Sequence, residues 1–197
     1  MKTNSDHDSL YRIAETQAGY FTSEQARSVG FTPSLLAYHA QGRQFERIEH
    51  GLYRLIRFPA TPHEDLFVAS LSAGSHAVIS HDSALAFYEL SDLMPSEIHL
   101  TVPRTSSRRH PGLRFHTNRL EESEVSRYNG LRVTTVPRTI ADVAAGGLAD
   151  ELLIQAIHQS LQHGLTTLKK LQDVKGRGRK RVAHLIAKYI QNEETEI

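Results

Sequence analysis

Short segments with helical periodicity, each ended by a turn residue, make up the first part of the chain. Apolar side chains recur at helical spacing over residues 9–18, with Ser9 as the expected N-cap. A second helix is predicted over 23–29. A third is predicted over 33–41, with Thr32 as its N-cap and a proline at its first position. Two short helices joined by a tight glycine turn are typical of the helix-turn-helix motif.

Two segments with alternating apolar and polar residues follow the third helix. They cover residues 45–49 and 52–56, and His50 and Gly51 connect them, with glycine where a tight hairpin requires a positive φ. Three short helices followed by a hairpin are the order of elements in a winged helix-turn-helix. The pattern therefore predicts a DNA-binding domain of this kind in residues 1–58.

The third helix has one face suited to packing and one suited to contacting DNA. With Leu36 at the centre of the buried face, His39 lies close beside it, and we expect this histidine to pack rather than to bind a ligand. The opposite face would enter the major groove and offer donors and an aromatic ring to base edges. Four residues of this region are candidate DNA contacts: Thr32, Ser34, Tyr38 and Gln41.

Arginines around the hairpin are suited to contacting phosphates, which set the register and much of the affinity of a protein on DNA. The candidates are Arg43, Arg47, Arg54 and Arg57. Two further basic runs lie at 104–119 and 169–188, in a chain whose formal net charge is only +1. Such local patches suit a protein that meets a polyanion, either DNA or another acidic partner. They add the candidates Arg108, Arg109, Arg177 and Arg179.

A linker with two prolines at 59–62 marks the expected domain boundary. Beyond it we predict an α+β domain with a small sheet over 63–197, so the fold class of the whole chain is α+β. The predicted strands cover 77–80, 98–102, 113–117 and 131–136. The predicted helices cover 63–73, 83–90, 137–145, 150–163 and 181–191, with a further short helix capped by Thr166 or Thr167.

Composition indicates a soluble globular protein. Hydrophobic residues make up 39% of the 197 residues and charged residues 23%, and there is no cysteine. The lack of cysteine excludes disulfides, cysteine metal sites and a cysteine nucleophile. No apolar run approaches the roughly 18 residues of a membrane span, and the polar N-terminus does not resemble a signal peptide. We therefore expect a cytoplasmic protein without membrane contact.

The twelve histidines form no pattern that indicates catalysis or metal binding. There is no His-Glu-x-x-His motif, and the glycines at 176–179 lack the preceding strand and the Lys-Ser/Thr end of a phosphate-binding loop. Residues 81–83 have the residue types of a catalytic triad, but neighbours in sequence cannot form one, and helix capping explains them better. We therefore expect no enzyme activity, no metal and no cofactor.

The order of these motifs resembles the AbiEi antitoxin family. The similar phrases in the first part are GYFTSEQA at 19–26, GFT at 30–32 and RIEHGLYRL at 47–55. Those in the second part are VISHDSAL at 78–85, IHLTVP at 98–103 and VTTVPRTIAD at 133–142. The resemblance covers residues of about 10 to 160, and the joint occurrence of both halves is its most specific feature.

The resemblance implies the antitoxin of a type IV toxin–antitoxin operon. Such proteins repress their own operon by binding inverted repeats in the promoter as transcription regulators, here expected as a monomer or weak dimer on DNA. They counter a nucleotidyltransferase toxin, usually without stable contact, in abortive infection systems. Relatives with the phrase at 133–142 can continue into an endonuclease domain, but the remaining residues lack the acidic and lysine set of a nuclease.

Two alternatives to a repressor and antitoxin stay open. Residues 63–197 could be a nucleic-acid-processing enzyme or an enzyme remnant, which the histidines motivate. The first domain could instead use a winged fold only to bind another protein.

Overall fold

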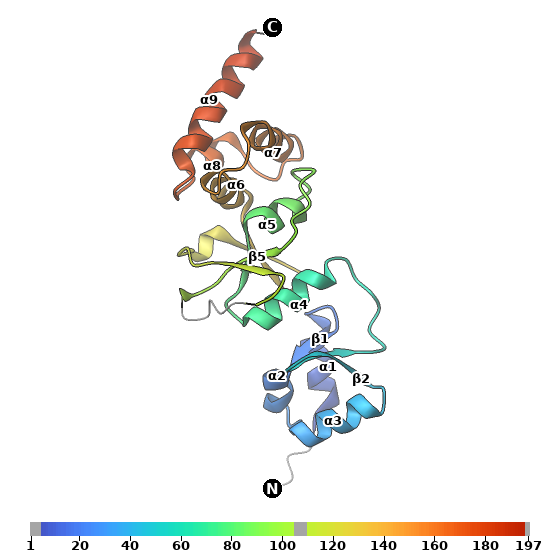
Figure 1. The fold of residues 1–197 in the computed structure, drawn as a ribbon. Helices are drawn as coiled ribbons and strands as arrows, with labels where there is room; N and C mark the ends of the chain where they lie inside the picture. Colours follow the sequence, from blue (N-terminus) through green and yellow to red (C-terminus); the bar gives the residue numbers. More distant parts are fainter. Residues whose placement is uncertain (1–4, 105–109, 196–197) are drawn as a thin grey trace. The chain divides into compact units, whose positions relative to one another are not determined.

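The chain forms two compact units of mixed helix and strand, which confirms the predicted α+β class. The computed structural model describes residues 5–104 and 110–195 (Figure 1). The first unit combines Met1–Ala77 with Arg127–Leu131, and the second combines Val78–Ser126 with Arg132–Ile197. The sequence places the boundary at 59–62, whereas the structure includes the following helix in the first unit.

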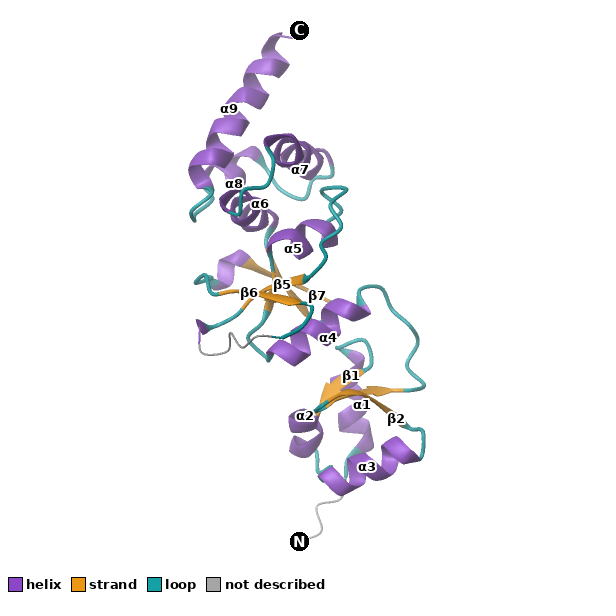
Figure 2. Ribbon diagram, in the orientation of Figure 1, coloured by secondary structure: helices purple, strands orange, loops and turns teal. Residues whose placement is uncertain are grey.

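The first unit contains three helices and a three-stranded antiparallel sheet, with a fourth helix after them (Figure 2). Its elements are α1 (His7–Glu15), β1 (Tyr20–Thr22), α2 (Ser23–Ser28), α3 (Pro33–Gln41), β2 (Phe45–Glu49), β3 (Leu52–Leu55) and α4 (Glu64–Ala73). The strand order is β1-β3-β2, so the residues between the first two predicted helices form a third strand beside the hairpin. Helices α2 and α3 and the hairpin lie where the periodicity predicts them, whereas α1 begins two residues and ends three residues before the predicted bounds of 9–18.

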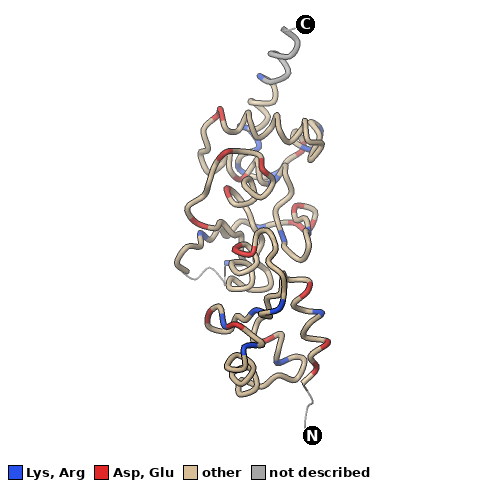
Figure 3. The backbone as a smooth tube through the Cα atoms, turned by 90° about the vertical axis from the view of Figure 1, so that its right-hand side faces the viewer, with Lys and Arg blue, Asp and Glu red and all other residues tan. Residues whose placement is uncertain are grey.

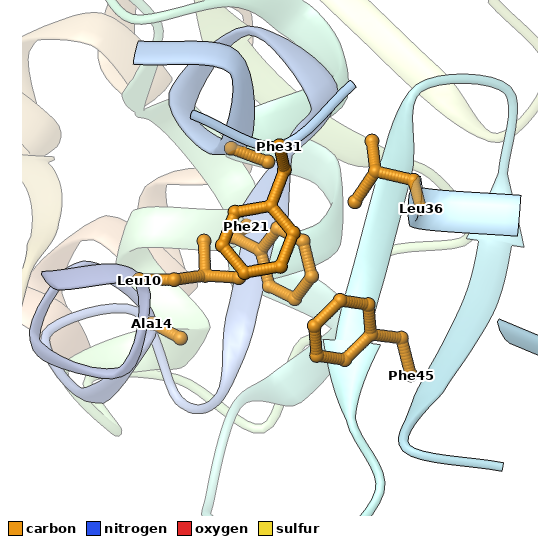
Figure 4. Close-up of a cluster of buried hydrophobic side chains, with 7 residues drawn as sticks. Leu10, Ala14, Phe21, Phe31, Leu36 and Phe45 are labelled. Atoms are coloured by element: carbon orange, nitrogen blue, oxygen red, sulfur yellow. The ribbon is translucent and has the colours of Figure 1, made fainter. Parts of the chain in front are cut away.

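Three phenylalanines from different elements form the centre of this unit's core. Phe21 on β1, Phe31 before α3 and Phe45 on β2 are all buried, and the ring centroids of Phe21 and Phe45 lie 5.1 Å apart. Leu10 of α1 and Leu36 of α3 point toward the same cluster (Figure 4). Each fully buried side chain of this size contributes about 1.5–3 kcal/mol, so this cluster holds α1 and α3 against the sheet.

Side-chain caps start the short helices at defined residues. The Asp6 carboxylate accepts hydrogen bonds from the backbone and hydroxyl of Ser9, so Asp6 is the N-cap of α1 and the sequence prediction of Ser9 is wrong. Thr22 and Gln25 form a reciprocal capping box at α2. Thr32 accepts from the backbone N–H of Leu35, which confirms the predicted cap of α3.

A two-residue turn connects β2 and β3 as predicted. Gly51 adopts a φ of +81°, a conformation that glycine takes at little cost. Pairing runs from Phe45 opposite Leu55 to Arg47 opposite Tyr53, and the register then shifts before Glu49. The regular pairing of this hairpin is therefore interrupted near its tip, as in a β-bulge.

Helix α4 belongs to the first unit because Glu64 at its start is bound there. The Glu64 carboxylate accepts hydrogen bonds from the Tyr20 hydroxyl, at 3.1 Å, and from Arg54 Nη2, at 3.0 Å. The backbone N–H of Thr61 donates to the same carboxylate, and this bond is the main reason why the pKa of Glu64 lies below its usual value. No local sequence pattern signals this long-range anchor across the linker.

A five-stranded mixed sheet forms the second unit, with α5, α6, α7 and α9 on the same side of it (Figures 1 and 2). The strand order is β6-β5-β4-β8-β7; β4 pairs antiparallel with β5 and parallel with β8, and β5 pairs parallel with β6. The strands are β4 (Val78–Ile79), β5 (Ile98–Thr101), β6 (Leu113–His116), β7 (Val125–Tyr128) and β8 (Leu131–Thr134). The helices are α5 (His81–Phe87), η2 (Glu122–Glu124), α6 (Val136–Ala145), α7 (Asp150–Gln162), α8 (Leu168–Gln172) and α9 (Arg179–Thr195).

Two features of this unit differ from the sequence prediction. Strand β7 and the short helix before it were not predicted, because this stretch is polar and has no apolar alternation. Helix α5 begins at His81 rather than two residues later, and Ser80 before it makes no side-chain cap bond. The predicted capping role of residues 81–83 is therefore wrong.

Among the described residues, no helix has the length and apolar character needed to cross a bilayer.

Candidate nucleic-acid interface

Helix α3 exposes the face that the sequence assigns to DNA contact. Leu36 and His39 are buried, whereas Ser34, Tyr38 and Gln41 are exposed, and 69% of the Tyr38 surface is open to solvent. The Tyr38 ring lies edge-on to that of His39, with centroids 5.4 Å apart, and most of its surface is free to contact a partner. The three candidate groove contacts therefore lie on one solvent-facing side of a nine-residue helix.

His39 packs inside the unit, as the sequence predicts. Its ring centroid lies 5.0 Å from those of His7 and Phe45, and its Nδ1 contacts the Gln44 side-chain oxygen. This histidine belongs to the core side of α3 and is not a candidate DNA contact.

Arg43 follows α3 in an exposed position and an unusual backbone conformation. Its φ is +52°, in the left-handed region that glycine commonly occupies after a helix. The N–H of Gln44 reaches back to the His39 carbonyl, at 3.0 Å, and closes the end of the helix. The exposed Arg43 side chain therefore leaves the backbone in the turn between α3 and β2.

Arg47 lies exposed on β2, near the tip of the hairpin. Its Nη2 is 3.2 Å from His50 Nδ1, and its Nε donates a long hydrogen bond of 3.4 Å to the Glu49 carbonyl. Both contacts are on the surface, so they cost little to exchange for a phosphate oxygen.

Arg54 is bound by groups of the first unit, which argues against the DNA contact that the sequence predicts for it. Only 14% of its side chain is exposed, and its Nη2 donates to Glu64 and to the carbonyls of Phe58 and Pro59. Its guanidinium also lies 5.6 Å from the centroid of the Tyr20 ring. Arg54 on β3 therefore binds both the linker and the start of α4. Periodicity alone does not bring these segments together, so no sequence pattern indicates these contacts.

Arg57 and Thr32 stay in the candidate set. Arg57 is exposed in the turn after β3, and Thr32 is exposed at the start of α3. The Thr32 oxygen already accepts the capping bond, but its hydroxyl hydrogen can still be donated to a phosphate.

Cations outnumber anions on the segment that carries α3 and the hairpin. Residues 33–57 contain four arginines and two glutamates. Arg54 is used internally, and Glu49 is within hydrogen-bond reach of Ser72, so Glu46 is the exposed acid of the segment. Figure 3 shows that both signs of charge occur in both units, so the positive character is local and modest.

The remaining candidate arginines belong to the second unit or cannot be placed. Arg108 and Arg109 lie outside the described residues. Arg179 is the exposed first residue of α9, and Arg177, two residues earlier, lines a cavity of the second unit. The structure therefore groups the candidates of α3 and the hairpin, and it separates Arg177 and Arg179 from them by unit.

No sequence pattern indicates that the polar residues of this cavity meet. His116, the pair Arg138 and Asp142, and Arg177 come from distant parts of the chain, and the tertiary fold brings them together. The spacing of Arg138 and Asp142, four residues apart on a predicted helix, was the available signal for an ion pair.

Comparison with known proteins does not assign the chain to a family. No protein-family model matches it, and no curated protein sequence matches it either. The resemblance to AbiEi antitoxins therefore rests on the motifs quoted from the sequence.

Proposed function

We propose that the first unit is a winged helix-turn-helix that binds double-stranded DNA and that the chain acts as a transcriptional repressor. The observation that carries this proposal is the exposed row of Ser34, Tyr38 and Gln41 on a helix whose opposite face is buried. The hairpin β2–β3 follows that helix directly and bears the exposed Arg47. A helix for the groove and exposed arginines on and around the hairpin (Arg43, Arg47 and Arg57) for the backbone supply the two kinds of contact that sequence-specific binding needs.

Within that class, the motif phrases favour an AbiEi-type antitoxin of a type IV toxin–antitoxin operon. On this proposal the chain represses its own promoter by binding inverted repeats, and it counters a nucleotidyltransferase toxin without stable contact. We propose no enzyme activity for the chain.

The DNA-binding proposal is tested with the region upstream of the chain's own gene. Fluorescence anisotropy with the full chain should show binding to a duplex from this region in preference to a scrambled duplex. Tyr38→Ala should weaken specific binding by about tenfold, because a base-edge contact contributes about 1–3 kcal/mol. Tyr11→Ala is the matched control, since Tyr11 is an exposed tyrosine on α1 rather than α3.

Two results would contradict the DNA-binding proposal. One is equal affinity for both duplexes in the unmodified protein, and the other is an equal effect of the two tyrosine substitutions. A stable complex with a neighbour-encoded protein, together with no DNA binding, would favour the protein-binding alternative.

The antitoxin proposal needs a separate experiment in cells. If a nucleotidyltransferase gene lies beside this gene, its expression alone should arrest growth, and co-expression of the full chain should restore it. Continued arrest with soluble, folded chain present would refute the antitoxin role while leaving the DNA-binding result intact.

A further inference from the structure

The second unit contains a cavity of about 830 Å³ that the DNA-binding proposal does not use. Its walls come from four separate parts of the chain. His81 stands at the start of α5 and His116 at the end of β6, while Arg138 and Asp142 lie on α6. Residues 175–177, just before α9, form the fourth part of the wall. This volume lies within the range of about 300–1,000 Å³ that is typical of small-molecule sites.

The acidic side chains of the cavity are already paired with its own cations. Arg138 donates from Nε to both oxygens of Asp142, at 2.9 Å, and from Nη1 to Glu124, at 3.0 Å. Lys175 Nζ lies 3.1 Å from a carboxylate oxygen of Glu121. The carboxylates are therefore balanced within the wall and offer little attraction to a cationic ligand.

The charge that remains for a ligand is positive. Arg119 and Arg177 line the cavity, and neither guanidinium has an ion pair or side-chain hydrogen bond within residues 5–104 and 110–195. Arg138 is a third candidate, because its hydrogen bonds to Asp142, Glu124 and the Arg119 carbonyl use Nε and Nη1 and leave Nη2 for a ligand. Guanidinium groups form paired hydrogen bonds with phosphate oxygens, so these three arginines suit a phosphate better than any neutral ligand.

The two histidines of the cavity add uncharged polar groups. Their rings stack with centroids 3.5 Å apart, and burial lowers the pKa of His81 to about 3 and that of His116 to about 4. Both rings are therefore neutral at pH 7. His116 Nε2 is buried without a hydrogen-bond partner among the described residues. A buried polar atom of this kind costs about 1–3 kcal/mol until a ligand or water satisfies it.

The segment that carries Arg177 is held rigidly against α6. Gly178 approaches the helix backbone so closely that a Cβ there would lie 1.9 Å from the Ala141 carbonyl oxygen. Three residues further on, Arg181 binds the carbonyl of Ala144, at 3.0 Å. Because Gly178 and Arg181 both lie against α6, the residue next to Gly178, Arg177, is held near the cavity by the fold.

From the two unpaired arginines, the internally neutralised carboxylates and the unsatisfied His116, we infer that this cavity binds a phosphate-bearing ligand of about nucleotide size. Arg119 and Arg177 hold the phosphate, and the neutral polar wall at His116 faces the rest of the molecule. The cavity lies entirely within the second unit, so the inference does not depend on DNA binding by the first unit.

The test uses the full chain with ATP, GTP, inorganic phosphate and adenosine at matched ionic strength. Isothermal titration should show binding of at least one nucleoside triphosphate, with adenosine binding at least tenfold more weakly. Arg119→Ala and Arg177→Ala should each weaken nucleotide binding by about tenfold or more, since hydrogen bonds to charged groups are the stronger ones. Arg179→Ala is the control, because Arg179 is exposed nearby but does not line the cavity.

A second measurement keeps the inference testable if a variant folds poorly. In the unmodified protein, the phosphate charge should raise the pKa of His116 from about 4 when nucleotide is added, as followed by its imidazole NMR signals. Binding to none of the four probes would overturn the inference. So would binding of inorganic phosphate with exclusion of nucleotides, or equal losses in Arg177→Ala and Arg179→Ala. None of these outcomes bears on DNA binding by the first unit, so failure here leaves the proposed function standing.

Discussion

Arg43 combines a strained backbone with a position suited to a phosphate contact. Its φ of +52° costs a residue with a Cβ about 1 kcal/mol relative to glycine. Arg43→Gly should therefore raise the free energy of unfolding by about 1 kcal/mol while lowering DNA affinity several-fold. Arg43→Ala should lose the same affinity without the gain in stability. Chemical denaturation and anisotropy titrations measure the two effects, and unchanged affinity in both variants would remove Arg43 from the interface.

Arg54 and Arg57 are three residues apart but should respond to substitution in opposite ways. Arg54 holds Glu64 at 3.0 Å, so Arg54→Ala should destabilise the protein by about 1–3 kcal/mol and leave DNA affinity unchanged under conditions where it is folded. Arg57 is exposed, so Arg57→Ala should leave stability unchanged and weaken DNA binding. A loss of affinity in folded Arg54→Ala as large as that in Arg57→Ala would show that the buried arginine reaches DNA after all.

The buried histidines make the stability of the second unit depend on pH. The folded protein holds the pKa of His81 at about 3, below the usual value of 6.5, mainly because burial disfavours the charged ring. Between these values the unfolded chain binds the proton more readily, so the stabilisation is complete above pH 6.5 and is lost as the pH falls toward 3. The slope contributed by this one group is at most about 1.4 kcal/mol per pH unit.

Replacing His81 by asparagine isolates this effect. Asparagine tolerates the φ of +51° at this position and does not titrate in the range. The dependence of unfolding free energy on pH between 6.5 and 4 should be flatter in His81→Asn than in the unmodified protein, whatever the absolute stability of the variant. Parallel curves for the two proteins would contradict the assignment.

At the scale of elements, helix α3 depends on its cap because it has only nine residues. Removal of the Thr32 hydroxyl leaves the Leu35 N–H without its acceptor, so Thr32→Ala should cost about 1 kcal/mol of stability. Thr32→Ser keeps the acceptor and should stay close to the unmodified protein in thermal denaturation. If alanine and serine behave alike, the cap does not determine the stability of this helix.

At the scale of the whole molecule, DNA binding should depend on salt in proportion to the exposed arginines. If Arg43, Arg47 and Arg57 each neutralise one phosphate, the logarithm of the binding constant falls against the logarithm of salt concentration with a slope of about −3. Each alanine substitution among them should reduce this slope by about 0.9. The measurement needs the full chain, because residues 127–131 belong to the first unit. A slope near zero would exclude binding through phosphates.

The same titration decides which unit meets DNA. Arg177→Ala should leave the slope unchanged if this arginine serves the cavity of the second unit. A reduction of about 0.9 in the magnitude of the slope would instead indicate that Arg177 contacts a DNA phosphate, as the sequence predicts.

Sequence patterns were sufficient where a structure is specified by neighbouring residues. Helix α3, its Thr32 cap and the turn at Gly51 were predicted because capping, periodicity and the φ preference of glycine act within a few positions. The same local rules failed at β7, where the strand is stabilised by pairing within the sheet and not by its own polar residues.

The sequence by itself determined the α+β class, the order of the first three helices and the hairpin, and the face of α3 that stays open to solvent, because each depends on periodicity within one segment. Tertiary structure alone decided that Arg54 is enclosed with Glu64 and that Arg119, Arg138 and Arg177 meet around one cavity. Whether a cation faces solvent, a carboxylate or a ligand depends on groups far away in the chain, and their approach is set by the packing of whole elements.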